Sequence, residues 1–399
     1  MQDGAVLLAA DGRIAAVGPA SFTPLPPGAV EIELKGAALL PGLVNTHTHL
    51  ELTGFENQLP DVEFPVWIQR LIALKAGRSQ ADFQAAARRG IRDCWAAGIT
   101  TVADTGDSGA VIEALAELGA SGIGYHEVFG PHPDQAAPAI AAAARRLGEL
   151  ARFTGPRVRL GISPHAPYSV SGRLYAGVAA LAGERGLPVA VHLAESAEES
   201  LLLEQATGPF AEAWQKRGIP LPALPGRSPV AWLEQHGVLS RDTLCIHVVR
   251  ADPRDLDTLA RTAVAVAHCP RSNRRHAGRP APLGPMLARG LRVGLGTDSV
   301  ASVHPLDLLA EAREARAIGG LDAEAALRLA TADAARALGL EAEIGGLRPG
   351  KWGDLVALDL PGAVDEGLLA DTVLSRPPEA VALTLLAGRE VYRRGAAHP

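Results

Sequence analysis

"LLPGLVNTHTHLEL" (residues 39–52) is an apolar run that ends in two histidines, His47 and His49. Residues two apart in a β-strand point to the same face, so the two imidazoles are expected side by side at the end of a strand. Neutral imidazole is a common metal ligand. A polar strand end on the surface is the alternative, and the pair alone does not decide between them.

The same pattern, a short apolar run followed by an Ala-rich helical stretch, recurs along the chain. Near-continuous apolar runs are typical of buried parallel strands, and eight such β-then-α units predict an α/β fold, a (β/α)8 TIM-like barrel. An open doubly wound sheet is the alternative, because periodicity does not reveal closure. The expected strands lie in residues 38–46, 98–104, 122–130, 157–165, 187–195, 242–250, 263–270 and 291–299.

The two ends of the chain have a different pattern. Residues 1–40 carry the alternating segments "GAVLLAADGRIAAVG" and "AVEIELKG", and residues 346–399 carry "GDLVALDL" and "AVALTLLAGREVYRRG" with little helical pattern. We therefore expect residues 1–40 plus 346–399 to form one small β-sandwich domain. Residues 41–345 are expected to form the barrel domain.

Composition excludes several functional classes. A net charge of -6 over 399 residues gives no sign of a nucleic-acid partner, and no apolar stretch is long enough to span a membrane. The N-terminus lacks the features of a signal peptide. Three cysteines, a sparse and odd number, suit a reducing cytoplasm. The expectation is a cytoplasmic protein with a small-molecule substrate; the oligomeric state stays open, and a homodimer is one option.

Polar residues fall at the ends of most of the expected barrel strands, where barrel enzymes place their chemistry. Core packing does not explain so many of them, so a converging site is predicted. Three imidazoles and one carboxylate from this set suit Zn²⁺ or Fe²⁺, with one position left for water. The residues are His47, His49, His165, His192, His247, His268 and Asp298.

Five segments together resemble the amidohydrolase superfamily, and within it the aminohydrolase and chlorohydrolase branch. They are "PGLVNTHTHLEL", "SPHAPYSVS", "VHLAES", "HCPRSN" and "VGLGTDSVAS". The resemblance covers nearly the whole chain, and it implies a hydrolase that removes ammonia from a cyclic amidine. A triazine chloro- or aminohydrolase is an alternative, and so is a non-catalytic relative, although the latter would be expected to lose ligands.

The resemblance implies a role for each matched residue. His47, His49, His192 and Asp298 would bind one divalent metal, with zinc preferred over iron. Glu195 would move a proton between water and a ring nitrogen, His247 would hydrogen-bond the water or the developing oxyanion, and Asp298 would also act as a base. Other branches bridge two metals with a lysine after the fourth strand. Lysine occurs here only at positions 35, 75, 216 and 351, which favours a single metal.

The implied substrate is an adenine nucleoside, contacted by His165, Trp67, Glu195 and Arg271. Relatives that deaminate methylthioadenosine and S-adenosylhomocysteine hold the ribose with a glutamate where this chain has Pro65. Arg271, Arg274 and Arg275 follow the seventh strand, and arginine pairs well with carboxylates. A solvated basic loop is the alternative. The hypothesis is therefore 6-amino-6-deoxyfutalosine, an adenine nucleoside with a carboxyphenyl group, on a route to menaquinone; methylthioadenosine, S-adenosylhomocysteine and guanine are the alternatives.

Several histidines are left over. His268 is interpreted either as a residue behind the metal ligands or as a structural strand end. His236, His276, His304 and His398 are expected to be solvated.

Overall fold

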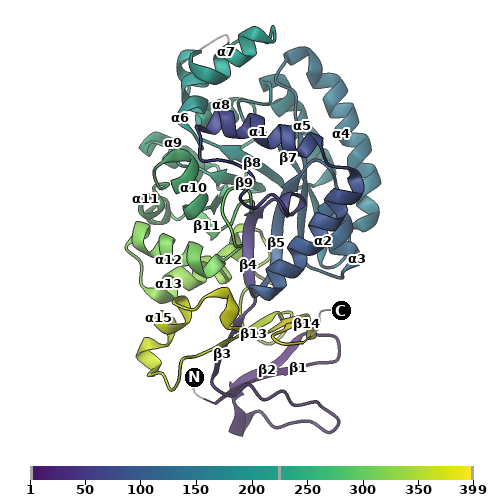
Figure 1. Cartoon of the computed structure of the whole chain (residues 1–399), viewed down its shortest axis with the longest axis vertical. Coiled ribbons are helices and arrows are strands. Elements are labelled where there is room, and N and C mark those ends of the chain that lie inside the picture. The colour runs from purple at the N-terminus through teal and green to yellow at the C-terminus, as the bar shows by residue number, and fades with distance from the viewer. Residues whose placement is uncertain (1–2, 223–225, 397–399) are drawn as a thin grey trace.

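The computed structural model describes residues 3–222 and 226–396, and its central feature is one sheet of eight parallel strands in chain order (Figure 1). At the open seam, the N–H groups of Thr297 and Asp298 both donate to the carbonyl of His47 at 3.0 Å. The first and last strands therefore lie together, and the predicted TIM-like barrel is confirmed. The strands are β4 (Leu43–Thr48), β5 (Ile99–Gly106), β6 (Gly122–Val128), β7 (Val158–Pro164), β8 (Val189–Leu193), β9 (Thr243–His247), β10 (Ala265–His268) and β11 (Arg292–Leu295).

Helices cover the outside of the barrel, so the strands are buried on both faces. Every residue of β5, β8 and β9 is buried, as expected of strands with side chains inside the barrel and against helices. The helices are α1 (Phe64–Ala76), α2 (Gln80–Ala96), α3 (Ala110–Glu117), α4 (Ala136–Leu150), α5 (Gly172–Arg185), α6 (Ala197–Ser200), α7 (Gly208–Lys216), α8 (Pro229–Gln235), α9 (Pro253–Arg261), α10 (Pro270–Ala277), α11 (Leu283–Ala288), α12 (Leu308–Gly319), α13 (Ala323–Leu329), α14 (Ala332–Ala337) and α15 (Leu369–Leu374).

Both chain ends meet in a second sheet below the barrel in Figure 1. It is antiparallel and four-stranded, in the order β14-β13-β12-β3, and a separate hairpin pairs β1 with β2. Val6 and Leu8 of the hairpin pack with Leu355 and Leu383 of the sheet, which gives the small two-layer arrangement expected of a sandwich. The strands are β1 (Gly4–Leu8), β2 (Ile14–Pro19), β3 (Ala37–Pro41), β12 (Leu355–Asp359), β13 (Val381–Leu386) and β14 (Arg389–Arg393).

The boundaries of the two predicted domains stay a prediction. The chain passes from β3 to β4 between Pro41 and Leu43, and returns to the second sheet at Leu355. Residues 1–2 and 397–399 of the predicted sandwich lie outside the described residues.

Two local expectations are corrected. The segment "AVEIELKG" (residues 29–36) forms no strand, and Val30 is 87% exposed, because it pairs with no neighbouring strand in the described chain. The three arginines after the seventh strand lie on α10, which begins with Pro270 at its first turn. Proline suits a helix start, since its fixed φ is helical and its missing N–H would have no partner there.

Among residues 3–222 and 226–396, no helix combines the length and the apolar character that crossing a bilayer would require.

Candidate active site

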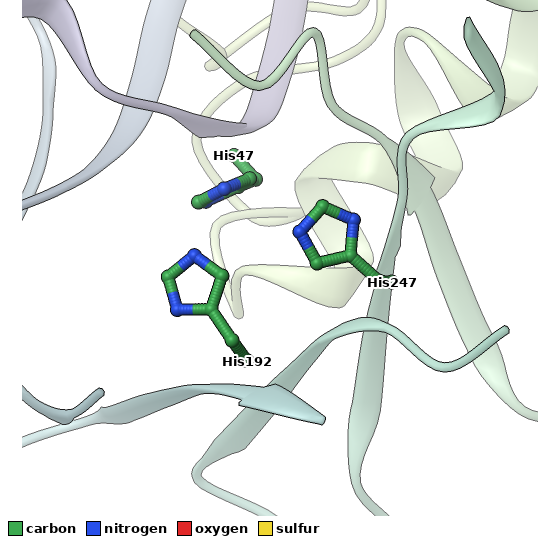
Figure 2. A group of neighbouring side chains, drawn as sticks. All are labelled: His47, His192 and His247. Atoms are coloured by element: carbon green, nitrogen blue, oxygen red, sulfur yellow. The ribbon is translucent and has the colours of Figure 1, made fainter. Parts of the chain in front are cut away.

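The carboxyl ends of the barrel strands bring the predicted metal ligands together. His47 is the next-to-last residue of β4, His192 lies on β8 and His247 ends β9. Figure 2 shows their three rings facing a common space. The ring centroid of His47 lies 5.0 Å from that of His192 and 5.6 Å from that of His247. His49 completes the group, with its ring centroid 4.8 Å from His47. Four imidazoles from three strands therefore share one small volume.

Hydrogen bonds outside this volume fix the tautomers of two of these rings. His49 Nδ1 lies 2.8 Å from the carbonyl oxygen of Thr105, and His192 Nδ1 lies 3.2 Å from that of His165. A carbonyl can only accept, so Nδ1 carries the proton in both rings and Nε2 keeps its lone pair. This arrangement is typical of metal-binding histidines.

His47 supplies the clearest sign of a missing partner. It is fully buried, and neither ring nitrogen has a hydrogen-bond partner among the described residues. Burial lowers the pKa of His47 to about 3 and holds the pKa of His192 well below its ordinary value. Both rings are therefore neutral at pH 7, which is the form that binds metal.

Asp298 faces the same volume from the end of β11. Its Oδ1 lies 3.5 Å from His47 Nε2 and 3.6 Å from His49 Nε2, longer than ordinary hydrogen bonds. Burial alone would raise the pKa of Asp298, but the facing histidines hold it well below its usual value. Ser272 Oγ donates to Oδ2 at 2.6 Å and the Ser299 N–H donates to Oδ1 at 2.7 Å, which orients the carboxylate.

The donor set fits a divalent metal ion. Three neutral imidazoles and an ionised carboxylate match the N and O ligands of zinc and iron sites. The backbone is also strained at this point, because His247 and Asp298 have φ of 70° and 57°. Such left-handed conformations are costly for residues other than glycine and gather at functional sites.

Glu195 and His247 form a second pair beside the histidine cluster. Glu195 Oε1 lies 3.5 Å from His247 Nε2, and both side chains are almost completely buried. Burial raises the pKa of Glu195 well above its usual value, and the charges of Asp298 and Glu199 act in the same direction. A carboxyl group that can hold a proton near neutral pH is suited to general acid–base work.

An apolar cluster covers the mouth of the barrel near Trp67. Trp67, on α1, is 4% exposed and packs with Phe64 and Tyr168. His165, which follows β7, lies with its ring 4.8 Å from the ring of His192. These two of the four residues predicted to contact substrate therefore lie at the barrel mouth, and their contacts with a substrate stay predictions.

The expectation of a solvated His276 is wrong. Its ring centroid lies 4.5 Å from that of Trp67, and its Nε2 is buried without a partner among the described residues. His236 is also partly buried, with Nδ1 2.8 Å from the carbonyl oxygen of Trp232, whereas His304 is exposed. The contact of His276 with Trp67 joins α10 to α1, and a local sequence pattern does not reveal contacts between distant helices.

The three arginines of α10 lie in different environments. The Arg271 backbone N–H donates to the buried Glu311 at 2.9 Å, and its guanidinium lies 3.7 Å from the same carboxylate. Arg274 pairs with Glu314 on the surface. Arg275 donates to the carbonyls of Leu59, Ala301 and Ser302, and so connects two loops at the mouth.

The residue that orients His247 was not found from the sequence. Asn273 Oδ1 accepts from His247 Nδ1 at 2.9 Å, and Asn273 Nδ2 lies 3.3 Å from His268 Nδ1. His268 is the last residue of β10 and is connected to His247 through Asn273, and its role stays a prediction. The signal was present in "HCPRSN", where Ser272 and Asn273 are polar residues just after a strand.

A family model described as "Amidohydrolase family" matches residues 38–391. The chain belongs to the amidohydrolase family. The resemblance predicted from the five sequence segments is confirmed, and so is the prediction of an enzyme, a hydrolase of carbon–nitrogen bonds. Enzymes of this family depend on metal, in agreement with the histidine and aspartate cluster.

Curated relatives and solved structures agree with this membership. A 5-methylthioadenosine/S-adenosylhomocysteine deaminase of Symbiobacterium thermophilum is 30% identical, over 98% of this chain and 89% of its own length. An aminodeoxyfutalosine deaminase of Deinococcus radiodurans is 35% identical, over 77% of this chain and 75% of its own. A crystal structure of an adenosine deaminase from Xanthomonas campestris with bound zinc has a TM-score of 0.85 and 25% identity, over 99% of this amidohydrolase and 89% of that chain.

Proposed function

We propose that this amidohydrolase is a metal-dependent hydrolytic deaminase of an adenine nucleoside. The observation that carries the proposal is the convergence of His47, His49, His192 and Asp298 beside the buried Glu195–His247 pair. Relatives named as nucleoside deaminases support it over most of the chain. The ligands are assigned to one divalent metal, with zinc preferred because a similar structure contains it.

Each catalytic side chain has a defined task in this reaction. A divalent metal held by the four ligands supplies Lewis acidity, which makes water a stronger acid. Glu195 takes one proton from the attacking water and delivers it to the ring nitrogen beside the reacting carbon. His247 donates its Nδ1–H to Asn273 Oδ1, so its Nε2 faces the water and the developing oxyanion.

The second proton completes the balance of the reaction. Asp298 accepts it and passes it to the departing amine, so that water and the amidine become a carbonyl and ammonia. The hydrogen bonds from Ser272 to Oδ2 and from the Ser299 N–H to Oδ1 orient the Asp298 carboxylate with Oδ1 toward the histidines. The burial of the whole group excludes bulk water and strengthens these electrostatic interactions.

The proposed substrate is 6-amino-6-deoxyfutalosine, converted to futalosine in menaquinone biosynthesis. Three observations support it: the 35% identity to a relative with that name, Pro65 in place of a ribose-binding glutamate, and arginines near the mouth. Glu63, the nearest acid to that position, is exposed. Of the arginines, Arg275 lies against loops at the mouth and has no acidic partner among the described salt bridges, so it can pair with a carboxylate.

Comparison of kcat/KM among candidate substrates tests both levels of the proposal. The panel contains aminodeoxyfutalosine, adenosine, methylthioadenosine, S-adenosylhomocysteine and guanine, with a chlorotriazine as control. A preference of at least about tenfold for the carboxylated nucleoside, about 1.4 kcal/mol in the transition state, supports the specific substrate. Ammonia release from another nucleoside at a higher rate rejects that substrate but keeps the deaminase. Chloride release alone rejects both.

A cytoplasmic location and a homodimer remain predictions.

A further inference from the structure

Glu199 is a buried carboxylate beside the site that the proposed mechanism does not use. It lies on α6 and is completely buried. Its Oε1 accepts a hydrogen bond from the Ala194 N–H at 2.8 Å, and its Oε2 accepts one from the Glu195 N–H at 2.9 Å. One carboxylate therefore holds two consecutive peptide groups, and the second belongs to the proposed proton carrier.

The two peptide groups form the turn that follows β8. Ala194 has a φ of 51°, a left-handed conformation that is strained for residues other than glycine. The turn begins two residues after His192 and ends at Glu195. On its other side, Ala194 accepts a hydrogen bond from the Arg250 N–H at 2.8 Å. Without the carboxylate, two buried N–H groups would lack acceptors in a backbone that is already strained.

Helix capping does not account for the contacts of Glu199 with the Ala194 and Glu195 N–H groups. The N-cap of α6 is Ser196, whose Oγ accepts from the Glu199 N–H at 3.2 Å. Glu199 has no salt bridge among the described residues, and burial raises its pKa to about 7, against the opposite effect of the backbone N–H groups of Ala194, Glu195 and Ser196. A buried carboxyl group without a cation is costly, which points to a specific task.

We propose that Glu199 is a positioning residue that directs the Glu195 carboxyl at the reacting atoms by fixing the turn at residues 194–195. The inference rests on the role proposed for Glu195. A small displacement of a catalytic group is enough to lower a rate substantially, because general acid–base transfer requires hydrogen-bond distance.

The first test is Glu199→Gln, which keeps the size of the side chain but leaves one amide oxygen to accept from two N–H groups. The expected result is a fall in kcat of about 10–100-fold, the range typical of residues that orient a metal site, with unchanged metal content and little change in KM. Ser196→Ala is the matched control, since it weakens the start of the same helix and keeps both contacts of Glu199. Wild-type kcat in Glu199→Gln, or an equal fall in Ser196→Ala, would overturn the inference.

A second test separates positioning from stability. Adding Ala194→Gly to Glu199→Gln should recover thermal stability, because glycine adopts positive φ freely, but should not recover kcat. Recovery of both would mean that Glu199 only stabilises the turn, and the inference would fail.

A double-mutant cycle tests whether Glu199 acts through Glu195. Glu199→Gln should add little to the loss already caused by Glu195→Gln. A full further loss would show that Glu199 acts elsewhere. If Glu195→Gln by itself retained turnover, the proposed function of Glu195 would be wrong, a result that does not depend on Glu199.

Discussion

Asn273 Oδ1 accepts a hydrogen bond from His247 Nδ1 over 2.9 Å, and this contact decides which nitrogen of His247 faces the site. An amide oxygen cannot donate, so the proton stays on Nδ1 and Nε2 is left toward Glu195. α10 supplies both Asn273 and Ser272, and so one helix orients His247 and Asp298 together.

Asn273→Ala should therefore lower kcat by about 10–100-fold while metal content stays unchanged, because the ring of His247 loses its fixed tautomer. Asn273→Asp keeps an acceptor for Nδ1 and should retain more activity than the alanine variant. Steady-state rates and elemental analysis of both variants check this. Equal activity of Asn273→Ala and wild type would show that the tautomer is set by something else.

Metal binding should depend on His192, and each chain should bind one ion. His192→Ala removes a neutral imidazole from a site with four proposed ligands, so metal and activity should be lost together. His236→Ala is the control, since His236 bonds to the Trp232 carbonyl away from the cluster. Elemental analysis of the active enzyme would contradict the single-metal prediction if it gave two full equivalents.

Glu195→Gln should keep the metal and lower kcat by about 10²–10⁴-fold, because the amide cannot accept the proton of water. Glu198→Gln is the control, since Glu198 lies nearby on α6 and makes no contact with the histidine cluster among the described residues. Its kcat should stay near that of wild type. Metal content measured on the same samples separates loss of proton transfer from loss of the ion. Near-normal turnover in Glu195→Gln would remove Glu195 from the mechanism.

Stability should fall with increasing pH because of Glu311. Burial raises the pKa of Glu311 from 4.5 to about 8, although the Arg271 N–H and guanidinium act in the opposite direction. Between these values the unfolded chain has released the proton that the folded protein keeps, so the contribution of Glu311 to stability is full below pH 4.5 and is lost as pH rises through about 8.

Glu311→Gln should therefore raise the free energy of unfolding more at pH 8 than at pH 5. Urea unfolding of both proteins at the two pH values, with equal metal content, measures the difference. Glu314→Gln, on the exposed side of the same helix, is the control. A difference that does not change with pH would show that Glu311 is ionised in the folded protein.

Recognition of the substrate's carboxylate should depend on Arg275 more than on Arg274. Arg275→Gln should lower kcat/KM for the carboxylated nucleoside more than for adenosine, because only the former has an anion to pair with. Arg274→Gln removes an equal charge from a surface pair with Glu314 and should change neither value appreciably. Arg271→Gln tests the residue first predicted from the sequence. Equal losses for both substrates would mean that Arg275 only holds the loops.

The sequence alone predicted the barrel, which the structure confirms, and a set of candidate metal ligands, which stays a prediction. Eight apolar runs, each followed by a helical pattern, are local signals. The carboxyl ends of these strands are where barrel enzymes place their active sites, and the predicted ligands are the residues found there: His47, His49, His192 and Asp298. The alternation within residues 29–36 predicted a strand that the structure does not contain. A strand also needs a neighbouring strand to pair with, and a local pattern does not reveal whether one is present.

Only the tertiary structure decided which residues orient His247 and Asp298. Asn273 reaches His247 across 26 positions of the chain, and Ser272 reaches Asp298 across 26. Trp67 and His276 come together from α1 and α10, although each looks ordinary in its own segment. Hydrogen bonds and ring contacts of this kind depend on how the helices pack around the barrel. Packing joins segments that are far apart in the chain, so local sequence patterns do not reveal these contacts.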